Sequence, residues 1–287
     1  MEFLEFANEI ADFIRERGKY ETSIKEVVKN NGIKLIGIIL GDSKKVQPVI
    51  YLEDYYRMFL RGSNMETLAN NIEEAYEMIR CDHNMDFFED YGKVENRIYM
   101  RLINYDRNEE LLKQVSHIRW HDLAIVFYYA LDWEERATIL LYESHLNLWR
   151  KTVEEIFQTA KRNMEKDIPV RLVTINEMVH EITGMELREE SPEIFVLTIQ
   201  GNRDGAAAIL YATEIKDLAD RLQSDLLFFP ASIHEFLIVK DNHERTYEED
   251  RMTVNMVNER EVHFQEFLSN NLYRYNREKD EIEVILE

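Results

Sequence analysis

The pattern of apolar and polar residues along 194–239 predicts strands and a helix that together form the central sheet of the chain. The stretch opens as a strand with one buried face, because Phe195, Leu197 and Ile199 alternate with less apolar residues. Thr213 is placed to cap a helix whose apolar residues recur at the spacing of one helix face. The predicted order is a strand at 195–199, a tight loop at 201–205, a strand at 206–211 and a helix at 213–222. A strand at 226–229, a turn at 230–235 and a strand at 236–239 follow.

Apolar residues at helical spacing predict helices in much of the remaining chain. In the helix expected at 247–258, we place Met252, Met256 and Val257 toward the core. The segment 169–184 is expected to be partly helical, and 261–268 is a further candidate helix. The other expected helices are 3–14, 54–60, 64–79, 108–115 and 144–166.

Strands are predicted in hairpins at both ends and in the middle of the chain. Asn31-Gly32 is a strong signal for a two-residue hairpin turn. The segment 94–103 is compatible with either a helix or a strand. The expected strands are 22–30, 33–40, 46–52, 123–131, 137–142, 272–275 and 282–286.

This mixture of helices and strands lacks the regular rhythm of a doubly wound parallel sheet. We therefore expect an α+β fold, in which mixed or antiparallel sheets with hairpins pack against helices. Residues 185–192 are acidic and the least patterned, so we expect a linker there. The predicted organisation is two intimately packed subdomains, 1–184 and 193–287, or one continuous domain.

Composition and charge narrow the classes of partner. The chain of 287 residues has 56 acidic and 35 basic residues, a formal net charge of −21. This charge disfavours direct binding to nucleic acid or to an anionic membrane, and it is compatible with a basic protein partner. The single cysteine, Cys81, excludes an internal disulfide and a cysteine-rich zinc site. With no signal peptide and no apolar run long enough to span a bilayer, we expect a cytoplasmic protein.

Two short clusters carry candidate chemistry. His117 and His121, followed by Asp122, have the four-residue spacing that on a helix could chelate a metal ion, but the cluster leads directly into a strand-like run, where side chains four apart are too far separated. Ser232, His234 and Glu235 bring a hydroxyl, an imidazole and a carboxylate together. Ser232 and His234 are two residues apart, which in an extended chain separates their side chains by roughly 7 Å, too far for direct proton transfer. Both clusters are also compatible with turns at strand ends.

A family resemblance rests on residues 22–40, 49–52, 102–105, 121–127, 145–149 with Glu154, Ala160 and Asn163, 196–198, 205–211, 229–235, 268–270 and 273–275. Together these stretches resemble an uncharacterised family of bacterial proteins classed only as a domain of unknown function. The resemblance implies one integrated unit of bacterial or mobile-element origin, and it brings no assigned activity and no catalytic residues. One departure is Ala231, where the family pattern leads us to expect serine.

The expected function is that of a non-enzymatic, acidic binding or regulatory protein without a cofactor. One specific version is an inhibitor that engages a basic, nucleic-acid-handling protein. An alternative is a hydrolase that uses Ser232, His234 and Glu235, with His121 and Asp122 from the other half of the chain. A third is a metal-dependent enzyme that uses His117 and His121.

Overall fold

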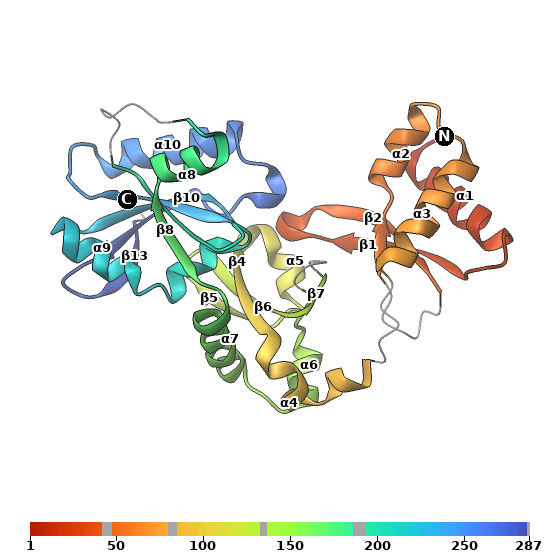
Figure 1. Ribbon diagram of the computed structural model, residues 1–287, viewed down its shortest axis with the longest axis horizontal. Helices are drawn as coiled ribbons and strands as arrows, with labels where there is room; N and C mark the ends of the chain where they lie inside the picture. The colour runs from red at the N-terminus through yellow and green to blue at the C-terminus, as the bar shows by residue number, and fades with distance from the viewer. Residues whose placement is uncertain (42–47, 80–84, 133–136, 186–192, 286–287) are drawn as a thin grey trace. The chain divides into compact units, whose positions relative to one another are not determined.

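Helices and antiparallel sheets make up the chain, which divides by its internal contacts into two units, Met1–Lys93 and Val94–Glu287 (Figure 1). The structure, a computed structural model, describes residues 1–41, 48–79, 85–132, 137–185 and 193–285. All strand pairings among these residues are antiparallel. The predicted α+β class is therefore confirmed. Cys81 and most of the expected linker, 186–192, lie outside the described residues.

The first unit is a three-stranded sheet with helices packed on it. The hairpin predicted around Asn31-Gly32 is confirmed, because β1 and β2 pair on either side of it. Its connection is longer than the predicted two-residue turn, since the last pair is Val28 with Lys34 and the 3₁₀ turn η1 lies between them. The helical stripe predicted near the N-terminus is also confirmed, since Phe6, Ile10 and Ile14 are fully buried in the core of this unit. The elements are α1 (Phe3–Glu16), β1 (Thr22–Val28), η1 (Asn30–Gly32), β2 (Lys34–Leu40), β3 (Val49–Tyr51), α2 (Glu53–Leu60), α3 (Met65–Ile79), η2 (Met85–Glu89) and α4 (Tyr91–Val94).

The second unit contains a six-stranded and a four-stranded sheet. The first has the strand order β13-β12-β10-β11-β9-β8, and the second has the order β4-β6-β5 with β7 paired to β6. The hairpins predicted at 123–142 and at the C-terminal end are confirmed. The strands are β4 (Ile98–Asn104), β5 (His117–Trp120), β6 (Leu123–Asp132), β7 (Ala137–Leu140), β8 (Val170–Thr174), β9 (Phe195–Ile199), β10 (Leu226–Ser232), β11 (Glu235–Lys240), β12 (Leu272–Asn276) and β13 (Glu281–Ile285).

Helices cover both sheets of this unit. In Figure 1, α8 and α10 lie along one face of the six-stranded sheet, with α10 in contact with β10 and β12, and α7 lies against β4. Every helix among the described residues is too short or too polar to cross a membrane. The helices are η3 (Glu95–Arg97), η4 (Asp106–Asn108), α5 (Glu109–Leu112), α6 (Glu143–Trp149), α7 (Val153–Asp167), α8 (Ile175–Thr183), η5 (Gly205–Leu210), α9 (Glu214–Leu222), α10 (Tyr247–Arg260) and η6 (Phe264–Glu266).

The strands that precede and follow residues 185–192 along the chain belong to one sheet. β8 lies before this segment and β9 after it, and the two pair directly, with Val170 opposite Ile199. The two contact-defined units therefore divide the chain at a different place from the expected subdomains 1–184 and 193–287.

Three expected elements have a different form in the structure. The run 206–211, expected as a strand, is the short 3₁₀ helix η5, because an apolar run without alternation does not distinguish a strand from a buried helix. The long helix expected at 144–166 is broken into α6 and α7 at Arg150, whose φ of 56° is left-handed. The candidate helix 261–268 contains only the single turn η6.

Candidate functional site

The tight turn between β10 and β11 holds Ser232, His234 and Glu235. The Ser232 hydroxyl donates to the Glu235 carboxylate (2.8 Å) and accepts a hydrogen bond from the His234 backbone N–H (3.0 Å). Ser232 is itself buried. These bonds close the turn locally, as serine hydroxyls often do. Both hydrogen bonds of the Ser232 hydroxyl are therefore made within the turn, to the Glu235 carboxylate and from the His234 backbone amide.

The imidazole of His234 makes its contacts elsewhere. Its Nδ1 accepts a hydrogen bond from the backbone N–H of Asp204 (3.0 Å), and its Nε2 lies 3.6 Å from the Glu266 carboxylate. Among the described residues, no hydrogen bond joins this imidazole to the Ser232 hydroxyl. A serine nucleophile needs a base within hydrogen-bond reach. The geometry therefore favours a role for His234 in holding the Asp204 loop.

His117, His121 and Asp122 lie at the β5–β6 hairpin. His117 is in β5 and its Nδ1 is 2.8 Å from the carbonyl oxygen of Val115, whereas His121 is in the turn with a left-handed φ of 55°. The described residues contain no cluster of three or more histidine, cysteine, aspartate or glutamate side chains arranged to hold a metal ion. The described residues therefore supply no set of metal ligands for the alternative of a metal-dependent enzyme.

Asp122 joins the two sheets of the second unit. Its carboxylate accepts hydrogen bonds from the hydroxyls of Ser269 and Tyr273, both at 2.6 Å. Burial, with the neighbouring Asp122 charge, raises the pKa of the Tyr273 hydroxyl well above its usual value. Among the described residues, no hydrogen bond or ion pair connects His121 or Asp122 with the Ser232 cluster. The two predicted clusters therefore make separate sets of hydrogen bonds, and each set has a clear structural role.

The orientation of α10 differs from the prediction and exposes a distinct surface. Met252, Met256 and Val257, expected to face the core, are 60%, 46% and 40% exposed. The buried residues of this helix are Asp250, Val254 and Asn258. The prediction was wrong because it placed the apolar residues of the helix toward the core. The side that is actually buried contains only one apolar residue, Val254.

Hydrogen bonds to the buried polar residues of α10 explain this orientation. The Asn258 side-chain amide donates to the carbonyl oxygen of Ser269 (2.7 Å) and to the side chain of Asn270 (2.8 Å). Asp250 is paired with Arg245 (3.1 Å), although burial raises the pKa of the Asp250 carboxyl. Because each buried polar group has a partner, its burial is tolerated, and the methionines remain in solvent.

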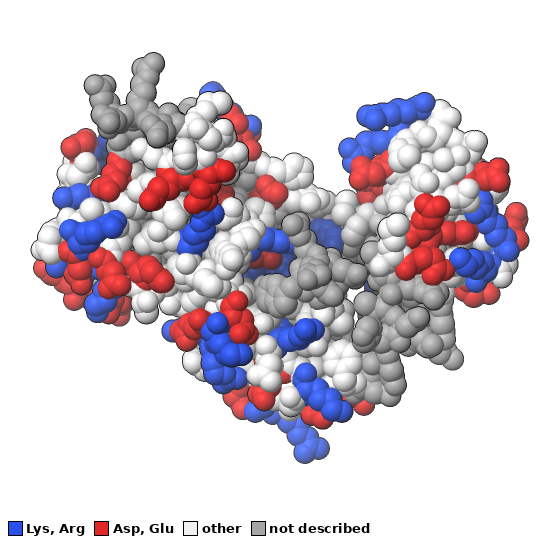
Figure 2. All heavy atoms as spheres, in the orientation of Figure 1, with Lys and Arg blue, Asp and Glu red and all other residues white. Residues whose placement is uncertain are grey.

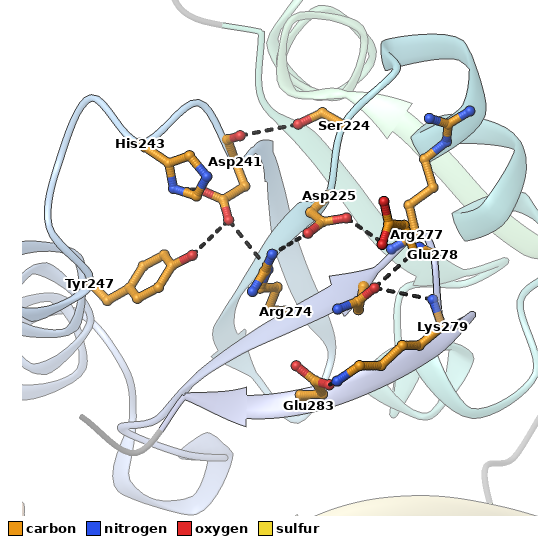
Figure 3. Close-up of polar contacts among 11 residues, drawn as sticks. Ser224, Asp225, Asp241, His243, Tyr247, Arg274, Arg277, Glu278, Lys279 and Glu283 are labelled. Atoms are coloured by element: carbon orange, nitrogen blue, oxygen red, sulfur yellow. Dashed lines mark hydrogen bonds and ion pairs between the residues drawn. The ribbon is translucent and has the colours of Figure 1, made fainter.

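A polar cluster fixes the first turn of α10 to the sheet. Figure 3 shows Tyr247 and Arg274 converging on the Asp241 carboxylate, which accepts from the Tyr247 hydroxyl at 2.8 Å. Arg274 also pairs with Asp225, and His243 Nδ1 lies 3.0 Å from Asp241. Burial and this hydrogen bond raise the pKa of Tyr247 to about 12. Tyr247 therefore stays a hydrogen-bond donor at neutral pH and holds the helix in place.

The negative charge of Asp225 in this cluster is stabilised by groups from β12 and the turn that follows it. Burial acts to raise the pKa of the Asp225 carboxyl, but the Arg277 backbone N–H and the Arg274 guanidinium outweigh it and lower that pKa. Thr246 and Glu249 form a reciprocal N-terminal cap, in which the Thr246 backbone N–H lowers the pKa of Glu249. The start of α10 is thus fixed by both a cap and a buried ion-pair network.

Comparison with known proteins yields a family and no activity. A family model described as "Family of unknown function (DUF5688)" matches residues 3–277. No curated protein and no solved structure matches the chain.

Proposed function

Because the chain belongs to this family of unknown function, which supplies no activity, we propose from the structure that it is a non-enzymatic binding protein. In this proposal, the outer face of α10 binds a basic, amphipathic helix of a partner protein. We define the outer face of α10 as Glu248, Met252, Met256 and Glu259. The observation that carries the proposal is the exposure of these apolar residues between carboxylates on one well-anchored helix.

The chemistry of this face fits a basic helix. Glu248, Met252 and Met256 follow one another at four-residue spacing, and Glu259 lies one turn beyond Met256, so the four lie on one side of the helix. Methionine side chains adapt to varied apolar surfaces, and exposed apolar patches with polar rims commonly mark protein interaction sites. The flanking carboxylates select a partner that carries lysine or arginine beside its apolar residues.

Anchoring of α10 supports tight binding. The helix is held at its start by Thr246 and Tyr247 and near its end by Asn258. A surface that is already ordered loses little conformational entropy when a partner docks. The free energy of contact is therefore available for affinity.

The net charge of the chain favours the same class of partner. Figure 2 shows acidic side chains spread over the visible face and interspersed with basic ones. An excess of 21 negative charges attracts basic proteins over a distance, while the outer face of α10 supplies the specific contact. We include in the proposal that the partner is a nucleic-acid-handling protein, which this chain inhibits, and that both are cytoplasmic.

A designed peptide tests the proposal without knowledge of the natural partner. The probe is a fluorescently labelled synthetic helix with lysines along one side and leucines along the other, and fluorescence anisotropy measures its binding. We expect saturable binding that weakens as salt is raised. The double variant Met252→Gln/Met256→Gln should bind about tenfold more weakly, because it loses apolar contact area.

Leu148→Gln is the matched control, because Leu148 is 53% exposed on a different helix, α6. Its affinity for the peptide should equal that of the wild type. Binding that is unchanged between low and high salt, or equal losses in the control and the double variant, would contradict the proposal.

A further inference from the structure

The second unit contains a cavity of about 420 Å³ beside the loop that follows β9. Its volume is in the range of sites for small molecules. The lining comes from β4, β6, β7, the end of α7 with the two residues after it, and the end of β9 with its loop, which are brought together only by the fold. The residues on which the inference rests are Arg101, Tyr128, Thr138, Arg203 and Asp204.

The guanidinium of Arg101 is held in place but its donors are largely unused. It stacks on the Tyr128 ring, with its central carbon 4.4 Å from the ring centroid. Its Nη1 lies 3.6 Å from the Asp204 carboxylate, which is beyond hydrogen-bond distance. Its Nε is buried and has no hydrogen-bond acceptor among the described residues. A buried donor without an acceptor is costly, and an ordered water or a ligand oxygen beside the guanidinium would offset that cost.

Further donors face the same cavity. The Tyr128 and Thr138 hydroxyls make no hydrogen bond to any described residue, and Arg203 makes no ion pair within the described part of the chain. Burial raises the pKa of Tyr128 to about 12, so its hydroxyl remains a donor at neutral pH. The cavity therefore offers two guanidinium groups and two hydroxyls beside the carboxylates of Asp167 and Asp204.

His234 has a supporting role at this cavity. Its Nδ1 accepts the backbone N–H of Asp204, a residue with a left-handed φ of 55°. Gly205, the next residue, packs against the His234 carbonyl oxygen and Thr198. The position of the Asp204 carboxylate, and with it the orientation of Arg101, is thus set by the β10–β11 turn.

We propose that this cavity binds a small organic molecule through a phosphate or carboxylate group. Arg101 and Arg203 would hold the oxyanion, and the Tyr128 hydroxyl would donate a hydrogen bond to it. The planar fork of a stacked guanidinium suits two oxygens of one such group. Asp204 keeps Arg101 in position without occupying its donors. This site is independent of the outer face of α10.

Isothermal titration calorimetry on the full chain tests the site, with inorganic phosphate in one arm and succinate in the other. We expect saturable binding in at least one arm, and the stronger arm identifies the natural ligand as a phosphate or a carboxylate. Arg101→Gln and Arg203→Gln should each weaken that binding about tenfold or more, because each removes charge-assisted hydrogen bonds. Arg203 is exposed, so its substitution leaves folding intact even if loss of Arg101 does not.

Arg17→Gln is the control, because Arg17 has a similarly exposed side chain, 26% against 23% for Arg101, but lies in the other unit. Its binding should equal that of the wild type. The proposal is overturned if neither probe binds saturably to the wild type, or if Arg203→Gln and Arg17→Gln bind equally well.

Discussion

Gly205 lies where β9 and the β10–β11 turn meet, and a side chain there has no space. A Cβ atom would meet the Thr198 hydroxyl, the His234 carbonyl oxygen and, at 2.8 Å, the Ile199 backbone nitrogen. Two of these are backbone atoms, which cannot move aside cheaply. The absence of a side chain thus allows η5 to approach the strands and brings Asp204 to His234.

Gly205→Ala should lower the free energy of unfolding by about 3 kcal/mol, because overpacking of a rigid site forces backbone shifts. Chemical denaturation of the purified variant measures the change. Gly92→Ala is the control, since the nearest atom to a Cβ there is an Asp90 carboxylate oxygen at 3.4 Å, and it should have almost no effect. Equal stability of the two variants would show that Gly205 is not tightly packed.

The sequence predicts the polar residues of the candidate clusters but not their partners. His234 bonds to a residue 30 positions away, and Asp122 bonds to Ser269, 147 positions away. Spacing rules compare neighbours in the sequence, so they group Ser232 with His234 and His117 with His121. In the folded chain, the side chains of the two members of each pair make their contacts with different partners. Arg101 gave no local signal, because its cavity is formed by distant segments.

At the scale of elements, α10 shows that hydrogen bonds and ion pairs of polar residues can decide which side of a helix is buried, even where the apolar residues predict the other side. The tethers at Asp250 and Asn258 outweigh the burial of two methionines. Hairpins were predictable because short segments with turn-forming residues separate adjacent apolar runs in the sequence. The run that forms η5 was not, because its small apolar residues fit a strand or a buried helix equally well.

Val254→Ala should lower the free energy of unfolding by about 2 kcal/mol, because it removes buried methyl groups from the contact of α10 with the sheet. Met252→Ala, two residues away on the outer side, should change it by less than about 0.5 kcal/mol. Urea denaturation of both variants distinguishes the two orientations of the helix. A larger loss in Met252→Ala would place the methionines in the core.

At the scale of the whole molecule, buried and half-buried tyrosines make the second unit sensitive to alkaline pH. Burial is the largest cause of the raised pKa of each, with nearby carboxylates adding to it in most cases. The tyrosines concerned are Tyr99, Tyr128, Tyr211, Tyr247, Tyr273 and Tyr275.

Stability should therefore fall as pH rises above about 10. The unfolded chain loses these protons near the ordinary tyrosine value of 10.0, whereas the folded chain retains them to higher pH. Their contribution is fully present below pH 10 and is lost as pH rises through the folded-state values. Urea denaturation between neutral and alkaline pH, with tyrosinate absorbance recorded in parallel, measures this. Tyr273→Phe should show a smaller loss, and titration of all tyrosines near pH 10 in the folded chain would contradict the prediction.

The central claim is that the outer face of α10 binds a basic amphipathic helix, and methionine methyl NMR tests it most directly. The chain has 11 methionines, and Met78 and Met185, which are 76% and 67% exposed, serve as internal controls. On titration with the lysine–leucine peptide, we predict saturable shifts of the Met252 and Met256 methyl signals, with Met78 and Met185 unchanged. Absence of any shift at Met252 and Met256, or equal shifts at all four, would contradict the claim.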